Sequence, residues 1–565
     1  MSTERRALIA MVLMLAVLMF YWMYAPKRSR APEPAAPETE ATQPEMAGGP
    51  DAAARAGAGE ATGEPAEAGK GALDVGVAAG PGESIRVETP LISADFNTSG
   101  GVITSFKLKQ FPGVDEAPVE LLPESEGGAL GVLLFTDAGE RVDLSRAEFA
   151  PSTMELEVGP GGGGALTFTM TTEQGLEVVK HLSFKSDTYM IDARVSVSGP
   201  GSETVRAIEI GWQSGLATTE VRVNDDRRGF AGLTYIPEEG LEKKSIKDVK
   251  KQDVVSLGGE IAWAGTKTKY FLAAFVPIEA ERVISKSFEA GEEHIGVSLE
   301  TQRPASGVQD YRIYVGPLDY IDLKTFDLGL ERAVDFGWSW IRPLSRLVFS
   351  FMIWVHKAVP NYGVVIILLS LIVKILFWPL TQKSFKSMRE MQKLQPALSE
   401  LRKKYKDDPK KLNEMMWKLY KAKGVNPAGG CLPMLLQMPV FIALFNLLSR
   451  TIELRRAPFM LWINDLSAPD VIARTPFSLP FVGNHLSVLP ILMGVAMFIQ
   501  QKMSSTDPQN KMMTYMLPII FTVIFYRFPS GLVLYWLVNN ILTIMHQYLL
   551  ARSDQEGPYQ LPEDM

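Results

Sequence analysis

The stretch VVIILLSLIVKILFWPL, residues 364–380, is apolar throughout except for Ser370 and Lys374. Its length and hydropathy predict a membrane-spanning helix. A lysine within hydrocarbon costs roughly 2.5 to 3.5 kcal/mol on insertion scales, so it indicates a functional site unless its ammonium reaches the membrane surface. Lys374 therefore has two interpretations: a charge that is used inside the membrane, or a side chain that extends to the interface.

The next charge along the helix bears on this choice. Lys383 lies about 14 Å beyond Lys374 at the helical rise, which is farther than a lysine side chain reaches. With the interface at Trp378 the ammonium reaches the surface, but the remaining apolar run is short for a bilayer. Ser370 precedes Lys374 by one helical turn, so both side chains face the same way. We interpret them as neighbours in one polar site.

The composition excludes several kinds of chemistry. The chain has 565 residues, a net charge of -7 and a mean hydropathy of +0.05, an average over a soluble part and a membrane part. The single cysteine, Cys431, excludes a disulfide framework and a cysteine-based metal site. The five histidines are scattered without metal-ligand spacing, and neither a P-loop nor a nucleophile elbow occurs. We predict a protein that is not an enzyme and has no cofactor or metal.

The N-terminal region contains two segments. Residues 1–25 hold an apolar run that follows Arg5 and Arg6 and ends in aromatic and then basic residues. A cleaved signal peptide has small residues before its cleavage site, so we predict an uncleaved membrane anchor. Residues 26–72 are rich in Pro, Ala, Glu and Gly, which predicts a disordered linker.

Residues 73–320 change to short runs in which apolar and polar residues alternate, separated by glycine-rich turns. Many short strands at this spacing predict a large β-sandwich domain. Its aromatic residues, such as Trp263 and Tyr270, are more typical of a core than of a ligand groove. The charged run at residues 225–228 is more typical of a solvated loop than of a site.

Two helical segments follow the sandwich. Residues 321–342 repeat apolar residues at helical spacing, with Trp338 and Trp340 beside charged residues. This pattern predicts an amphipathic helix that lies in the membrane interface. Residues 343–382 are predicted to form a lead-in helix and the second span, which carries Lys374.

Residues 383–427 form a basic segment. Between residues 383 and 423 there are 13 Lys and Arg against 5 Asp and Glu, which places the segment in the cytoplasm by the positive-inside rule. Apolar repeats on both sides of residues 407–409 predict a helical hairpin, with Pro396 either kinking the first helix or marking its start. The charge either solvates the hairpin or binds anionic lipid headgroups or ribosomal RNA.

The rest of the chain alternates apolar runs with loops. With the anchor and the second span, it predicts an α-helical polytopic membrane protein of six spans, with both termini cytoplasmic and the sandwich outside. The segments are a third span (428–450), an outside loop (451–484), a fourth span (485–503), a cytoplasmic loop (504–511), a fifth span (512–528), a sixth span (529–550) and an acidic cytoplasmic tail (551–565).

The predicted spans contain polar residues but no acidic ones. Gln437, Gln501, Asn539 and Asn540 supply amides, each of which is more typical of a hydrogen bond between helices than of a site. Without a carboxylate in any span, Lys374 should be stabilised by water. The sequence therefore predicts a wet cavity within the helices.

Three motifs resemble the YidC/Oxa/Alb family of membrane protein insertases. They are NPAGGCLPMLLQMPVFIALFNLL (426–448), APFMLWINDLS (457–467) and FPSGLVLYW (528–536). The resemblance covers residues 335–550, and the long outside domain after an anchor is similar to the Gram-negative YidC type. It implies a five-helix insertase core, a supersandwich-like domain in the periplasm, and a location in the bacterial inner membrane.

The resemblance also implies a function. Inner-membrane proteins would be inserted, and helped to fold and assemble, through a hydrophilic groove with a central positive residue. That residue is usually Arg in the family and is Lys374 here, which keeps the charge but lacks the bidentate fork. The other implied groove contacts are Ser370, Gln501 and Trp536, and the implied hydrophobic slide for client helices consists of Phe441, Met493 and Ile524.

The implied partners are nascent membrane proteins, the lipid bilayer, the Sec translocon with its accessory subunits, and the ribosome or signal-recognition machinery at the basic hairpin. Some relatives contact the ribosome through a basic C-terminal tail, which the acidic tail here does not match. Two other classes stay open. One is a transporter or channel whose lysine binds an anion, which should show inverted repeats; the other is a membrane-tethered sugar-binding or enzymatic sandwich.

Overall fold

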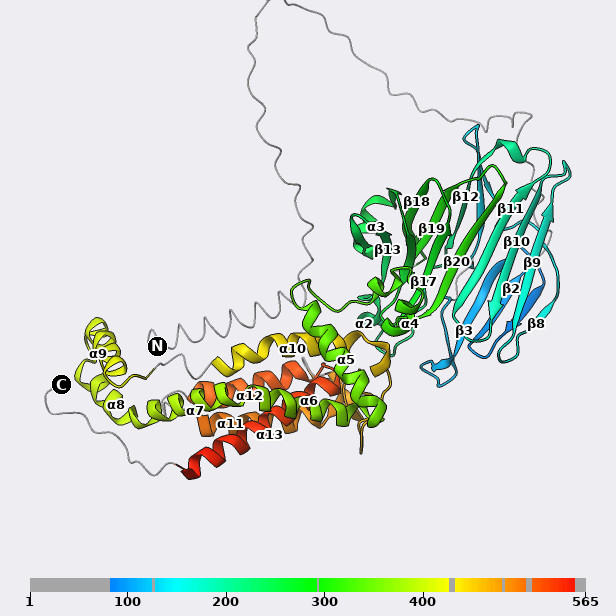
Figure 1. Ribbon diagram of the computed structural model, residues 1–565. Helices are drawn as coiled ribbons and strands as arrows, with labels where there is room; N and C mark the ends of the chain where they lie inside the picture. Colours follow the sequence, from blue (N-terminus) through cyan, green and yellow to red (C-terminus); the bar gives the residue numbers. More distant parts are fainter. Residues whose placement is uncertain are drawn as a thin grey trace, which may run out of the picture. The chain divides into compact units, whose positions relative to one another are not determined.

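Figure 1 shows the chain as a computed structural model with a β-rich domain and a group of helices. The structure describes residues 82–123, 128–291, 294–425, 432–479, 483–504 and 511–553. The predicted anchor at 1–25, the linker at 26–72 and Cys431 lie outside these ranges, as do most of the cytoplasmic loop at 504–511 and of the tail at 551–565.

The β-rich domain is built from three sheets. The largest has the order β14 (Gly240–Lys244), β13 (Ala231–Ile236), β16 (Trp263–Lys267), β17 (Phe271–Ile278), β20 (Val308–Pro317), β11 (Met190–Ser198), β10 (Glu177–Lys185), β9 (Gly163–Thr171) and β7 (Ala150–Pro151). The second has the order β15 (Val254–Gly259), β18 (Val283–Ala290), β19 (His294–Gln302), β12 (Val205–Trp212), β5 (Val132–Thr136) and β6 (Arg141–Asp143). The third has the order β4 (Pro118–Glu120), β3 (Val102–Pro112), β2 (Ile92–Asn97), β1 (Ser84–Glu88) and β8 (Glu155–Glu157).

The strands bury alternate residues, as their sequences predict. In β10 and β11 every second side chain is buried, which gives each strand one core face. The first two sheets pack against each other through β13 and β16 on one side and β18 and β19 on the other. The Thr234 and Ser285 hydroxyls share a hydrogen bond of 2.8 Å across this layer. The β-rich character predicted for this part of the chain is confirmed.

Lys180, on β10, is buried in this domain without a carboxylate partner among the described residues. Its ammonium donates to the carbonyl oxygens of Gly100 at 2.7 Å, Gly101 at 2.6 Å and Leu130 at 3.2 Å. An ammonium has three hydrogens, so these carbonyls satisfy it completely. Burial nevertheless lowers the pKa of Lys180 to about 7.

The amphipathic helix predicted at residues 321–342 is not formed. The chain instead forms the short α4 (Tyr320–Thr325) and the 3-10 helix η2 (Leu330–Ala333). Between them Asp327 and Gly329 have φ angles of 54° and 73°, a left-handed conformation that ends a helix. Trp338 and Trp340 lie after η2, outside any helix, and their rings stack 6.0 Å apart.

The helix that follows, α5 (Arg342–Ala358), corresponds to the lead-in helix predicted at the start of residues 343–382. It buries one face, which includes Phe349 and Met352, and exposes Leu347 and Trp354 on the other. This helix begins where the two predicted segments meet, at residues 342–343.

The remaining helices are α6 (Tyr362–Leu376), α7 (Trp378–Lys393), α8 (Gln395–Lys404), α9 (Pro409–Ala422), α10 (Leu432–Arg450), α11 (Leu489–Ser504), α12 (Lys511–Phe525) and α13 (Ser530–Ser553). The 3-10 helix η4 (Ile452–Leu454) and the hairpin of β21 (Val471–Leu479) and β22 (Gly483–Ser487) separate α10 from α11. Figure 1 shows α6, α11, α12 and α13 running side by side, in agreement with their contacts.

The stretch at residues 364–380 is not one straight helix. Within the described residues, no single helix has both the length and the apolar character to cross a bilayer, but α6 and α7 together meet this test with a bend of 66° between them. The bend lies at Phe377, and Pro379 occupies the first turn of α7. Proline lacks an N–H and crowds the preceding turn, so it starts a new helix here.

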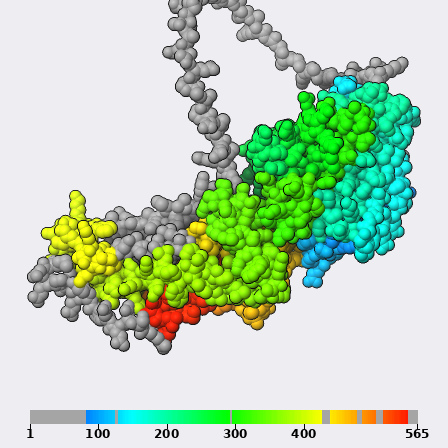
Figure 2. Space-filling view, in the orientation of Figure 1, coloured from blue at the N-terminus to red at the C-terminus, as the bar shows by residue number. Residues whose placement is uncertain are grey.

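Two helices, α8 and α9, follow α7 within the basic segment. Pro396 lies in the first turn of α8 and so marks the start of a helix. Asp408 caps α9 by accepting a hydrogen bond from the Lys411 amide at 3.1 Å. Leu398, on α8, and Leu419, on α9, belong to one small apolar core. Figures 1 and 2 show this pair beyond the end of α7.

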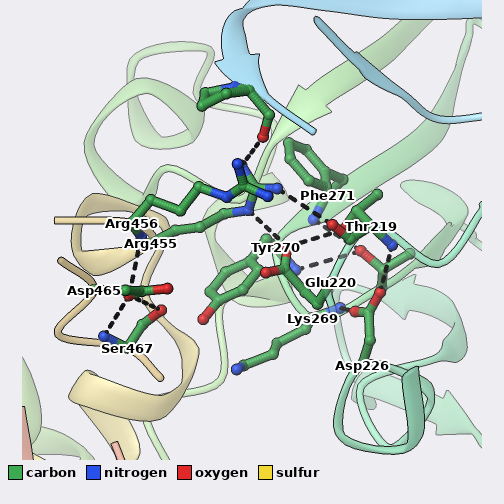
Figure 3. Close-up of polar contacts among 12 residues, drawn as sticks. Thr219, Glu220, Asp226, Lys269, Tyr270, Phe271, Arg455, Arg456, Asp465 and Ser467 are labelled. Carbon is green, nitrogen blue, oxygen red and sulfur yellow. Dashed lines mark hydrogen bonds and ion pairs between the residues drawn. The ribbon is translucent and has the colours of Figure 1, made fainter. Parts of the chain in front are cut away.

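Arg455, which follows α10, joins the helical part to the β-rich domain (Figure 3). Its buried guanidinium pairs with the Glu220 carboxylate at 2.6 Å and donates to the Pro112 carbonyl at 2.9 Å. It also lies over the Phe271 ring, 5.3 Å from its centroid. These contacts use its charge, its donors and its face, so Arg455 is fully engaged at this junction.

Candidate functional site

Lys374 lies in the last turn of α6, just before the bend. Its ammonium donates to the Thr543 hydroxyl on α13 at 2.7 Å. It also lies 6.0 Å from the centroid of the Phe385 ring on α7. Within the described residues it forms no ion pair with a carboxylate. The ammonium is therefore held by a neighbouring helix, through a single neutral hydroxyl.

Two of the predicted groove residues differ in their relation to Lys374. Ser370 lies one turn earlier on α6, is fully buried and donates to the Ile366 carbonyl of its own helix at 2.9 Å. Gln501 lies near the end of α11 and is partly buried. Among the hydrogen bonds of the described residues, none joins Gln501 to Lys374.

The third predicted groove residue, Trp536, belongs to an aromatic cluster. Its ring meets Phe441 of α10 edge to face at 4.9 Å and 87°. It also contacts Phe525 at 5.2 Å and Phe521 at 5.9 Å, both on α12. Trp536 precedes Thr543 by seven residues, so the two lie on the same face of α13. The structure thus brings together Trp536 and Phe441, to which the family resemblance gave places in the groove and in the slide.

The predicted slide residues are not equally accessible. Phe441 is buried under the aromatic cluster, and Met493, on α11, is completely buried. Ile524, on α12, is partly buried and packs against the main core. In this conformation, Ile524 is the most accessible of the three.

Sequence reasoning missed two residues beside Lys374. One is Thr543, its hydrogen-bond partner. The other is His546, which is buried and whose ring stacks on Trp378 at 3.7 Å and 14°. Asn539, Thr543 and His546 are spaced by four and three residues. That helical spacing of polar residues on an apolar helix is a signal that could have found them.

The amides of α10 and α13 form hydrogen bonds both between helices and within them. Gln437 donates to the Tyr535 hydroxyl at 3.1 Å, which joins α10 to α13. Asn539 donates to the Tyr535 carbonyl of its own helix at 2.9 Å. In the described part of the chain, no group of three or more His, Cys, Asp or Glu residues is arranged to hold a metal ion. The site therefore offers charge, hydroxyl groups and aromatic surface.

Comparisons with known proteins identify the family. Residues 84–350 match the family model described as the YidC periplasmic domain, and residues 354–556 match the one described as the 60Kd inner membrane protein. A membrane protein insertase YidC from Chlorobaculum parvum is 34% identical, over 96% of this chain and 94% of that protein. This chain belongs to the YidC family of membrane protein insertases.

Two further YidC insertases support the assignment. The one from Syntrophus aciditrophicus is 35% identical, over 97% of this chain and 100% of that protein. The one from Geobacter sulfurreducens is 38% identical, over 82% of this chain and 86% of that protein. As a YidC insertase, the chain is an inner-membrane protein with a periplasmic domain, which serves membrane protein insertion and is not an enzyme. This finding disfavours the anion transporter and the tethered enzyme.

Proposed function

We propose that this YidC family member inserts client proteins through a groove in its helical part, where Lys374 attracts the acidic flank of the client. One observation carries the proposal: in the described part of the chain, the Lys374 ammonium has one hydrogen bond, to the Thr543 hydroxyl at 2.7 Å, and no carboxylate partner. An ammonium in low-dielectric surroundings attracts a carboxylate strongly because little solvent screens the charges.

The groove has Lys374 at its centre, with Ser370, Gln501 and Trp536 as further contacts and water as the remaining partner of the ammonium. The hydrophobic slide consists of Phe441, Met493 and Ile524. The contact of Trp536 with Phe441 supports a groove wall that leads directly into the slide. Because Met493 is buried, its part in the slide requires α11 to move when a client helix arrives.

The topology of this proposal has six spans, with both termini in the cytoplasm. The β-rich domain, from about residue 73 to 320, is a supersandwich-like module, and the outside loop at residues 451–484 is periplasmic. The basic hairpin at residues 383–427 is cytoplasmic, which the excess of 13 Lys and Arg over 5 Asp and Glu between residues 383 and 423 supports. The hairpin is the site for the ribosome or the signal-recognition machinery, and the Sec translocon is a second partner.

Insertion in this scheme needs no nucleotide. The client helix gains about 25 cal/mol for each Å² of apolar surface that leaves water, and the membrane potential acts on its acidic flank. The groove lowers the cost of moving that flank by offering Lys374 and water in place of hydrocarbon.

The test is insertion of a small single-span client by the full-length chain in liposomes. Two versions of the client are compared, one with an acidic flank and one in which Asn and Gln replace the acids. We expect Lys374→Ala to lower insertion of the acidic client about tenfold, because close charge pairs contribute on the order of 1.5 kcal/mol or more. Lys374→Arg keeps most of the activity. The control, Lys383→Ala, removes an exposed lysine nearby and leaves both clients unaffected. Normal insertion of the acidic client by Lys374→Ala would refute the proposal.

A further inference from the structure

Two contacts tie the bend between α6 and α7 to α13. On one side of the bend, the Lys374 ammonium donates to the Thr543 hydroxyl at 2.7 Å. On the other side, one turn later, Trp378 stacks on His546 at 3.7 Å. The residues are spaced by four along the bent helix and by three along α13, so both contacts lie on one line between the helices.

The hydroxyl of Thr543 is oriented by its own helix. It donates its only hydrogen to the Asn539 carbonyl at 2.6 Å. Its lone pairs are therefore left for the Lys374 ammonium, and Thr543 acts only as an acceptor in that contact. One N–H of the ammonium is fixed in direction, and the other two hydrogens stay available for water or for a client carboxylate.

Without this acceptor, the Lys374 side chain can extend out of the groove. Ile375 and Leu376, beside Lys374, are each 68% exposed, so α6 has an outward surface at this level. A lysine side chain in a membrane extends toward the interface when nothing holds its ammonium. An ammonium that leaves the groove for a lipid headgroup no longer meets a client there.

We propose that Thr543 is a positioning residue of the insertase: it holds the Lys374 ammonium against α13 and so keeps the charge inside the groove for acidic clients. This inference rests on the function proposed for Lys374. His546 supports it by packing alone, since its ring stacks on Trp378 and both of its nitrogens lack a hydrogen-bond partner among the described residues.

The experiment uses the full-length chain in liposomes with the acidic and the amide client. Thr543→Val keeps the shape of the side chain and removes the acceptor, whereas Thr543→Ser keeps the acceptor. We expect Thr543→Val to lower insertion of the acidic client about tenfold, the effect of losing a hydrogen bond to a charged group. Insertion of the amide client stays unchanged, and Thr543→Ser behaves as the parent does.

A double variant tests whether Thr543 acts through Lys374. In the Lys374→Gln background, Thr543→Val should have no further effect, because the ammonium that it positions is gone. His546→Phe, which keeps the stacked ring, should insert both clients as the parent does.

Each other outcome has a definite meaning. If Lys374→Gln lowers insertion of the acidic client and Thr543→Val does not, the positioning role is wrong and the function proposed for Lys374 stands. If Lys374→Gln has no effect on the acidic client, the proposed function itself is wrong. The positioning role is also overturned if Thr543→Ser lowers insertion of the acidic client as much as Thr543→Val does. The same holds if Thr543→Val lowers insertion of both clients equally, since either result indicates a packing role.

Discussion

The β-rich domain and the helical part of this chain each contain a lysine that is removed from water, and they satisfy it differently. Lys180 is fully buried and gives its three hydrogens to the carbonyls of Gly100, Gly101 and Leu130. Lys374 is partly buried and gives one hydrogen to the Thr543 hydroxyl. Neither has a carboxylate partner among the described residues.

The difference arises from where backbone carbonyls are available. Gly100 and Gly101 lie in a turn with φ angles of 77° and 55°, so their carbonyls can point into the core at the Lys180 ammonium. In a helix each carbonyl points along the axis and already accepts a backbone amide hydrogen, so an ammonium from a neighbouring helix meets side chains first. The contact of Lys180 is therefore closed, because all three hydrogens of its ammonium are bonded. Lys374 has two hydrogens left for a ligand.

The largest expected effect comes from removing the ammonium of Lys180. Lys180→Met leaves three buried carbonyls without a donor, so we expect the free energy of unfolding of the β-rich domain to fall by about 3 to 4 kcal/mol. Insertion per folded molecule should not change. Denaturant unfolding of the full-length chain measures the first quantity and the liposome assay the second. Lys185→Met, at an exposed lysine on the same strand, is the control, and equal stability of the two variants would contradict the comparison.

A buried cation at the junction extends the comparison. Arg455 has a carboxylate, a carbonyl and a ring as partners. Arg455→Gln leaves the Glu220 carboxylate without its buried partner, so we expect a loss of about 3 kcal/mol in the free energy of unfolding. Thermal unfolding measures it, with Arg527→Gln at an exposed arginine as the control. A variant that unfolds normally yet fails to insert clients would show that Arg455 has a role beyond structure.

Reversing the charge sharpens the role of Lys374. We expect Lys374→Glu to lower insertion of an acidic client about a hundredfold, because two like charges then meet in a poorly screened site. A client whose flank carries lysines instead should be inserted better by this variant than by the parent. The ratio of the two clients in the liposome assay is the measurement. An unchanged ratio would mean that the charge of Lys374 does not select clients.

The smallest expected effect is a pH dependence of stability that arises from the buried Lys180. Burial lowers the pKa of Lys180 to about 7, whereas a lysine in the unfolded chain titrates near 10.4. Between these values the unfolded chain binds more protons, so the stability of the domain rises with pH. We expect a gain of about 1 kcal/mol between pH 7 and pH 8. In Lys180→Met the free energy of unfolding should no longer rise with pH in this range. An identical rise in parent and variant would mean that other groups cause it.

Much of the architecture could be predicted from local sequence. Alternation at residues 191–197 and helical spacing on both sides of residues 407–409 are properties of single elements, so strands and helices follow from them. Pro396 marks a helix start because its missing N–H acts on its own turn. The amphipathic helix predicted at residues 321–342 was wrong because the apolar spacing continues across the left-handed backbone at Asp327 and Gly329.

For the stretch at residues 364–380, too, some properties follow from the sequence and others only from the tertiary structure. By itself, the sequence determined that it is apolar, that it carries Lys374, and that no acidic residue occurs in the predicted spans to pair with that lysine. Only the tertiary structure decided that it bends at Phe377 and that Thr543, 169 residues away, receives the ammonium. The physical reason is that periodicity records which face of one helix is buried, whereas the partner of a buried charge depends on which helix packs against that face.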